Sequence, residues 1–281
     1  VPWEIARLSP HDATLAEKNV LIRALAGGEE PKPEPLVLQS DEPLRVLLVF
    51  AEAPDSRPLA ARQERQKLLA LFRGQIYPRH RVEVDVLCHG VTRERLVAQI
   101  ESQSGYHIVH WSGHGHLNLL ELYSEGKEPS RLTGQELVHL FAQAGGYVPR
   151  LVFLSACHSG NFLNLKDWAA FQAVLEGREP DGKRAEGEAA AAVLSTQLQE
   201  RPGYTGTAHA LLEAGISTVI AMRYEVGDDY ARDLAAAFYE RLLADDRPKR
   251  PDEALNQARR GLLQAAQRGE AHGYAACDHA T

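Results

Sequence analysis

A histidine and a cysteine in this chain stand among small residues in a way that suits nucleophilic catalysis. His114 lies between two glycines in the run Ser-Gly-His-Gly-His at 112–116, and Cys157 lies in the run Ser-Ala-Cys-His-Ser-Gly at 155–160. A cysteine thiolate is a nucleophile, and an adjacent imidazole can lower the pKa of the thiol and accept its proton. If the fold brings them together, the two residues predict a nucleophile with its base.

Gly115 directly follows the candidate base and would let its backbone N–H approach a substrate carbonyl closely. Such an N–H stabilises the oxyanion that forms when a thiolate attacks a carbonyl, and the N–H of Cys157 can be the second donor. The alternative is that Cys157 is a buried structural cysteine and that His114 is an unrelated loop residue. Two reactive clusters that both follow apolar runs favour the catalytic interpretation.

These apolar runs are typical of buried parallel strands. They occupy 106–111 and 150–154, and a helical pattern at 133–144 lies between them. A strand–helix–strand unit places both clusters at the carboxyl ends of strands, where open α/β sheets hold their ligand sites. If the two strands are neighbours, His114 and Cys157 lie side by side.

The rest of the chain continues the alternation of strands and helices. Further strands are predicted at 45–51, 81–87 and 216–222, a hairpin at 117–123, and further helices at 59–72, 92–102, 205–214, 228–243 and 252–267. This order predicts an α/β fold with a mostly parallel sheet sandwiched by helices. Residues 1–41 are expected to form an N-terminal helix and linker, and residues 42–281 one domain.

Residues 161–204 interrupt this pattern as an insertion. The middle of the insertion is charged, bears Gly and Pro, and has few apolar residues to pack. We expect it to be mobile without an activator and to gate the site when it becomes ordered.

Composition argues against several kinds of partner. The net charge is −7 and the pI about 6.0, without a basic run of the kind that binds nucleic acid. No apolar run approaches the roughly 18 residues that a membrane span needs, so no membrane partner is expected. Three scattered cysteines indicate a reducing, cytoplasmic setting rather than a disulfide framework. The chain starts at Val1 rather than Met, which predicts a segment of a longer protein.

A zinc site is a second interpretation of the same residues. Zinc accepts imidazole and thiolate ligands, and the chain offers such ligands at His110, His114, His116, Cys157 and His158. However, His110 and His114 flank a strand end, and no acidic ligand is close to them in the sequence. We therefore expect neither a metal nor another cofactor.

Together, the two motifs resemble the His and Cys motifs of caspase-like cysteine peptidases, and most closely those of the CHAT proteases, bacterial relatives of separase. The resemblance covers most of the chain from Arg45 onward, and residues 2–4 and 207–215 are similar to other parts of CHAT domains. It implies a caspase–haemoglobinase-like fold and endopeptidase activity, with His114 as general base and acid and Cys157 as nucleophile. Metacaspases usually carry an acid at the position of Ser155, so their type of specificity pocket is not expected here.

The resemblance also extends to the loop after the last strand, where separase supplies an acid to the pocket for the P1 residue. It implies that Ser155, Tyr224, Glu225 and Asp228 bind the substrate. A carboxylate of Glu225 or Asp228 in that pocket would favour a basic P1 residue. Asp228 could instead cap its helix, and Arg223 could favour an acidic P1 residue. A neutral apolar P1 residue is the next alternative.

CHAT proteases are often tied to sensor domains in bacterial defence, so the resemblance implies a protein substrate and an activating sensor domain or partner protein. Two other functions remain open at this point. The chain could be a catalytically inactive caspase-like scaffold, or a cysteine hydrolase that acts on small amides.

Overall fold

The computed structural model describes residues 36, 38, 42–52, 61–78, 80–103, 105–116, 118–125, 130–144, 146–157, 159, 163–164, 204–222, 226–245 and 247–268. The predicted N-terminal helix and nearly all of the predicted insertion lie outside these residues. None of the helices within the described ranges is long and apolar enough to span a bilayer.

A five-stranded parallel sheet forms the centre of the molecule, with the strand order β10-β7-β3-β1-β2. Its strands are β1 (Leu44–Ala51), β2 (Val82–Cys88), β3 (Ile108–Gly113), β7 (Leu151–Ser155) and β10 (Thr218–Ala221). All five were predicted from the sequence, four from apolar runs and β2 from its alternation of apolar and charged residues. The strand β2 lies at an edge, as its alternation of valines with charged residues suggests.

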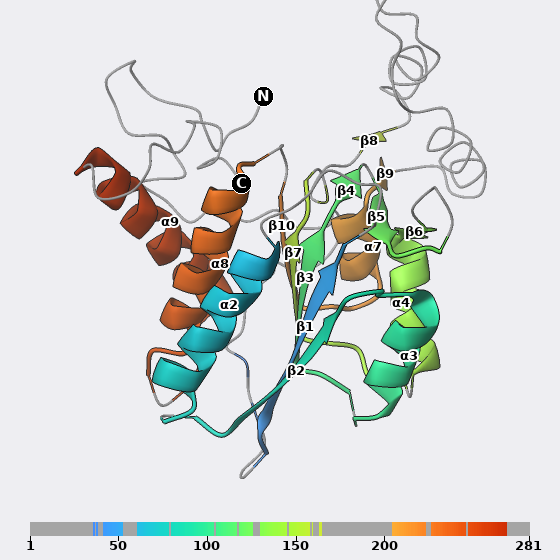
Figure 1. The fold of residues 1–281 in the computed structure, drawn as a ribbon, viewed down its shortest axis with the longest axis horizontal. Coiled ribbons are helices and arrows are strands. Elements are labelled where there is room, and N and C mark those ends of the chain that lie inside the picture. The colour runs from blue at the N-terminus through green and yellow to red at the C-terminus, as the bar shows by residue number, and fades with distance from the viewer. Residues whose placement is uncertain are drawn as a thin grey trace, which may run out of the picture.

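Helices cover both faces of this sheet (Figure 1). One layer consists of α2 (Ala61–Leu71) with its π-helical continuation η2 (Phe72–Ile76), α8 (Asp228–Leu242) and α9 (Pro251–Gln267). The other layer consists of α3 (Arg93–Glu101), α4 (Gly134–Gln143) and α7 (Thr207–Glu213). The predicted α/β sandwich is thereby confirmed.

The two faces of the sheet pack into two separate cores, and strand periodicity decides which side chain enters which core. In β1, Val46, Leu48 and Phe50 pack on the α2 and α8 side, whereas Leu47 and Val49 pack on the α3 and α4 side. All five side chains are almost completely buried. Apolar contact on both faces explains why this strand is hydrophobic without alternation.

A smaller antiparallel sheet follows β3 directly. It has the order β4-β5-β6 and consists of β4 (Gly115–His116), β5 (Leu119–Leu122) and β6 (Ser130–Thr133). The hairpin predicted at 117–123 is therefore present, but it begins earlier and gains a third strand. The turn depends on Asn118, which has a φ of 56° and accepts a hydrogen bond from the backbone of Gly134. A further two-stranded sheet pairs β8 (Leu163–Asn164) with β9 (Tyr204–Thr205).

Thr133 begins α4 with a capping box, and its loss should measurably destabilise the protein. Its hydroxyl accepts from the backbone N–H of Glu136, and its own backbone N–H donates to the Glu136 carboxylate. Thr133→Ala is expected to lower the free energy of unfolding by about 1 kcal/mol, measured by urea denaturation. The control is Thr92→Ala, because Thr92 caps α3 through an exposed hydrogen bond and without the reciprocal bond. A larger loss for Thr92→Ala would contradict the prediction.

Candidate active site

Pairing of β3 with β7 brings the two reactive clusters together. The two strands are parallel neighbours, and Ser112 is in register with Ser155. His114 and Cys157 are each the second residue after this pair. Because partners in a parallel pair lie about 4.8 Å apart and second residues return to the same face, both side chains reach one edge of the sheet. The condition on which the sequence prediction depended, that these strands are neighbours, is therefore met.

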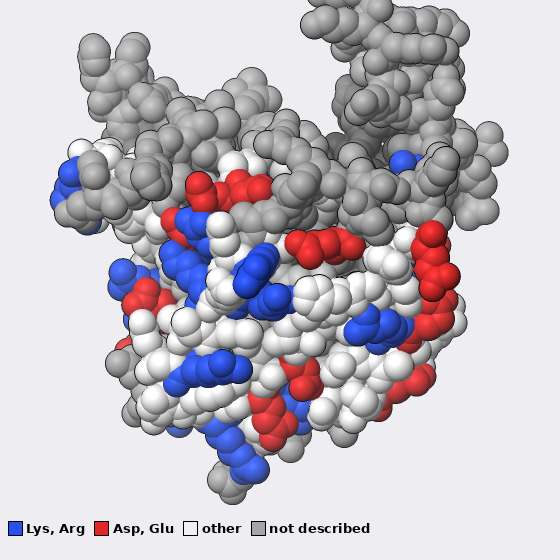
Figure 2. Space-filling view, in the orientation of Figure 1, with Lys and Arg blue, Asp and Glu red and all other residues white. Residues whose placement is uncertain are grey.

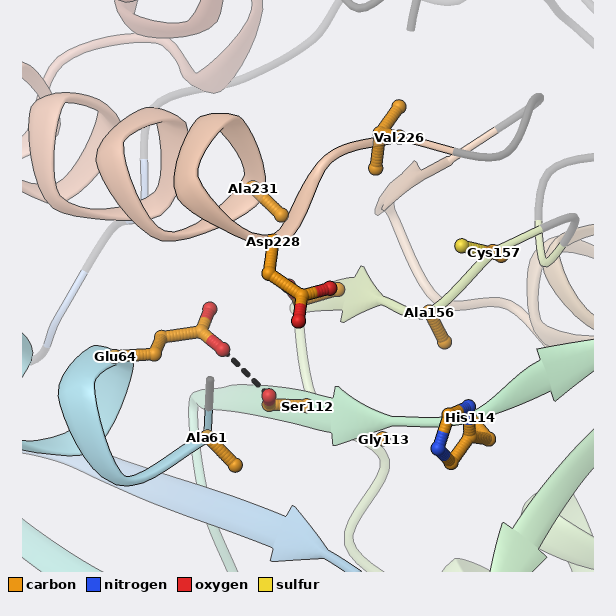
Figure 3. A pocket seen from close by; sticks show the side chains of 11 residues that line it. Ala61, Glu64, Ser112, Gly113, His114, Ala156, Cys157, Val226, Asp228 and Ala231 are labelled. Carbon is orange, nitrogen blue, oxygen red and sulfur yellow. Dashed lines mark hydrogen bonds between the residues drawn. The ribbon is translucent and has the colours of Figure 1, made fainter. Parts of the chain in front are cut away.

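Both side chains line a cavity that is open to solvent. The cavity lies between the carboxyl ends of β3 and β7 and the N-terminal turns of α2 and α8 (Figure 3). Its walls consist of Ala61, Glu64, Ser112, Gly113, His114, Ser155, Ala156, Cys157, Val226, Asp228 and Ala231. Of the residues expected to bind substrate, Ser155 and Asp228 line this cavity, whereas Tyr224 and Glu225 lie outside the described residues.

Gly115 lies against the peptide that carries the candidate nucleophile. A Cβ atom at this position would come within 2.6 Å of the carbonyl oxygen of Cys157 and 2.8 Å of the Cβ of Ala156. Real Cβ atoms do not make such close contacts, so only glycine fits here. This packing holds the strand end after His114 against the strand end that carries Cys157. The role of Gly115 as an oxyanion donor stays a prediction.

Asp228 does not cap α8. The N-cap is Gly227, and the helix makes no capping hydrogen bond through an N-cap side chain. Gly227 takes the extended backbone conformation that the cap position requires, with φ −65° and ψ 138°. The alternative that assigned Asp228 to capping is thus wrong by one residue. As the first residue of the helix, Asp228 points its carboxylate into the cavity (Figure 3).

Glu64 is a cavity residue that the sequence predictions did not include. Its side chain comes from α2 and the residue is only 4% exposed. The hydroxyl of Ser112 donates to Oε2 of Glu64 at 2.5 Å, and Nε2 of His110 lies 3.2 Å from Oε1. The helical periodicity of the sequence does indicate that Glu64 is buried, because it lies on the same face of α2 as the buried residues Ala61, Leu68 and Leu71.

His110 belongs to the core and not to the cavity rim. It is fully buried in the middle of β3 and packs on Phe153. Its Nδ1 lies 3.2 Å from the hydroxyl of Tyr239 and its Nε2 contacts Glu64. Both ring nitrogens are thereby engaged away from His114, so His110 cannot be a ligand of the zinc site considered above. The side chain of His116, and His158, lie outside the described residues.

Two basic side chains of α2 and α8 are engaged in ion pairs on the surface. Basic residues gather over α2 with acidic residues beside them (Figure 2). Arg232 of α8 contacts Asp229 at 2.5 Å and Asp233 at 2.8 Å, and Lys67 of α2 contacts Asp233 at 2.7 Å. These acids raise the pKa of Arg232, with the Asp233 hydrogen bond as the main cause. Arg232 is therefore directed at its neighbours on the helix surface.

A parallel sheet between two helix layers, with the ends of β3 and β7 meeting at one cavity, defines a three-layer α/β protein with its candidate site at the carboxyl ends of the strands. A model of the CHAT domain family matches residues 1–275, so the chain belongs to the CHAT domain family, as the motifs indicated.

Similarity to solved structures is more distant. The crystal structure of caspase-1 from Spodoptera frugiperda is similar over 50% of this chain and 58% of the caspase chain, at 14% sequence identity and a TM-score of 0.32. The chain thus spans less than two thirds of that caspase. No curated protein matches the chain.

Proposed function

We propose that this protein is a cysteine endopeptidase in which Cys157 is the nucleophile and His114 the general base and acid. The observation that carries the proposal is the register of β3 and β7, because it directs both side chains to one cavity. Membership of the CHAT domain family supports the same chemistry. The close packing of Gly115 on the Cys157 peptide supports a site in which the two strand ends act as one unit.

The proposed reaction has two stages. The Cys157 sulfur attacks the carbonyl carbon of the scissile peptide while His114 takes the thiol proton; the carbon–nitrogen bond then breaks, and His114 gives that proton to the departing amine. A water molecule next attacks the thioester and His114 takes a proton from it; the carbon–sulfur bond then breaks, His114 returns the proton to the Cys157 sulfur, and the carboxylic acid is released. The backbone N–H groups of Gly115 and Cys157 are proposed to stabilise the oxyanion in both stages.

A peptide acyloxymethyl ketone tests this assignment, because a catalytic thiolate displaces its carboxylate and keeps the peptide. We expect a single adduct on Cys157, identified by mass spectrometry of the digested protein, and a labelling rate that rises with peptide length. Cys88 is the internal control, since it is the other described free cysteine and is also partly exposed.

Each alternative function gives a different result in this experiment. An inactive scaffold would not label Cys157 faster than Cys88. A hydrolase of small amides would label Cys157 at a rate independent of peptide length. Either outcome would reject the endopeptidase.

The proposal includes a protein substrate and control by a sensor domain or partner protein in bacterial defence, in which ordering of residues 161–204 opens the site. Support for this part comes from the family resemblance. The labelling rate of a variant that lacks residues 177–187 tests it, and an unchanged response to activation would exclude the gating role.

A further inference from the structure

Two carboxylates face each other across one end of the cavity. Glu64 comes from the first turn of α2, and Asp228 is the first residue of α8. Their carboxyl groups converge, while His114 and Cys157 lie toward the other end (Figure 3). Among the described residues that line the cavity, no side chain is a lysine or an arginine. The described walls of the cavity beside the candidate nucleophile are therefore acidic.

A chain of hydrogen bonds lies behind the Glu64 carboxylate. Burial raises the pKa of Tyr239 well above its ordinary value, so the phenol keeps its proton and can donate it to Nδ1 of His110. His110 then carries its own proton on Nε2 and donates to Oε1 of Glu64, while Ser112 donates to Oε2. In this arrangement both carboxylate oxygens of Glu64 accept a hydrogen bond from inside the protein.

The N-terminal ends of two helices also favour negative charge at this place. The partial positive charge of a helix N-terminus stabilises carboxylates in the first turn, and both Glu64 and Asp228 occupy such positions. A carboxylate in a residue that is 4% exposed loses most of its hydration, and hydrogen bonds from charged donors offset that loss. A cationic ligand in the cavity would add such donors to the hydrogen bonds that His110 and Ser112 already make with Glu64.

We propose that Glu64 determines substrate specificity by binding a basic P1 side chain, with Asp228 on the opposite wall. The inference rests on the proposed endopeptidase function and names the class of its substrate. Each carboxylate oxygen of Glu64 accepts one hydrogen bond from the protein interior and retains a second lone pair. A guanidinium group, with five N–H donors in one plane, can bridge two carboxylates on opposite walls. A lysine ammonium group has fewer donors, so the expected order of P1 preference is Arg, then Lys, then neutral residues.

A positioning role is the main rival for Glu64. Its hydrogen bond to Ser112 anchors the end of β3, two residues before His114. If this were its only role, Glu64 would affect all substrates alike. Ser112→Ala is therefore the matched control, because it removes the same hydrogen bond and leaves the carboxylate in place.

The test compares peptides that carry Arg or citrulline at P1, since citrulline is an uncharged isostere of Arg. We expect the wild type to have a higher kcat/KM for the Arg peptide by roughly 10- to 150-fold, the range of a charge-assisted hydrogen bond. Glu64→Gln should reduce this ratio toward one, Asp228→Asn should reduce it as well, and Ser112→Ala should change it less than twofold. Circular dichroism melting curves establish that each variant is folded.

Several results would overturn the proposal. The first is a wild-type ratio of kcat/KM, Arg peptide over citrulline peptide, that is near one. The second is a ratio that stays unchanged in both Glu64→Gln and Asp228→Asn. The third is an equal loss of kcat/KM for both peptides in Glu64→Gln. If Glu64→Gln fails to fold, Asp228→Asn decides the outcome by the same ratio.

A binding measurement separates this inference from the endopeptidase function. Calorimetry with the Cys157→Ala chain measures the affinity of the pocket for the same two peptides in the absence of cleavage. Tighter binding of the Arg peptide together with no cleavage by the wild type would reject the endopeptidase and keep the acidic pocket. Cleavage without an Arg preference would reject the pocket and keep the endopeptidase, and failure of both measurements would reject both.

Discussion

Replacement of Cys157 or of His114 by alanine is expected to abolish peptide cleavage and leave the fold intact. Both residues lie at a cavity wall and neither is fully buried, so their side chains contribute little to the core. Loss of a nucleophile or its base lowers kcat on the order of 10⁴- to 10⁶-fold, and loss of both costs about as much as loss of one. Peptide hydrolysis by each single variant and by the double variant measures this, with circular dichroism as the check on folding.

Controls for this prediction come from the same residue types elsewhere in the chain. Cys88→Ala and His139→Ala, at positions away from the cavity, should retain wild-type activity. His116→Ala and His158→Ala are expected to be much milder than His114→Ala, and an equal loss there would favour a metal site. Full activity of folded Cys157→Ala would reject the cysteine peptidase.

The strands and their order along the chain could be predicted from sequence, but their neighbours could not. The run at 150–154 is recognisable because a strand with both faces covered has no polar alternation. Its pairing with β3 on one side and β10 on the other depends on tertiary structure, which the pattern of a single strand does not contain. The candidate site depends on this fact, since His114 and Cys157 approach each other only if β3 and β7 are adjacent.

Glu64 shows why part of the site was missed. Its position on the buried stripe of α2 was readable, yet an acidic residue on a helix is usually assigned to solvent. The groups that make its burial possible are remote in the chain, because His110 and Ser112 are 46 and 48 residues away. Sequence periodicity gives the direction of a side chain but not the partners that it meets there.

Two further errors come from the ends of elements. The strand that carries His110 was predicted to end at residue 111, whereas β3 continues to Gly113 and His110 lies in the core. Asp228 was offered as a helix cap, although Gly227 is the cap. Sequence patterns locate such ends only to within a few residues, and a shift of one residue changes which side chain faces the cavity.

Gly115→Ala is expected to lower kcat by about 10²-fold, the effect of misplacing a catalytic group by roughly 1 Å. The added Cβ would meet the carbonyl oxygen of Cys157 at 2.6 Å and the Cβ of Ala156 at 2.8 Å. Neither atom is the end of a flexible side chain, so the backbone on one side of the cavity must move. The movement would separate the strand end that carries His114 from the one that carries Cys157. Overpacking of this kind also lowers the free energy of unfolding by about 1–3 kcal/mol.

Gly261→Ala is the control for the effect of a methyl group as such. Gly261 lies within α9, and a Cβ there meets no atom within 4 Å. This variant should keep its activity and gain about 0.5–1 kcal/mol of stability, because alanine is the better helix former. Hydrolysis rates and urea denaturation of both variants, side by side with the wild type, make the comparison.

Ala156→Gly in the Gly115→Ala background should restore only part of the rate, since it relieves the second contact and leaves the carbonyl contact in place. Wild-type kcat in a folded Gly115→Ala chain would show that catalysis does not need the two strand ends in close contact.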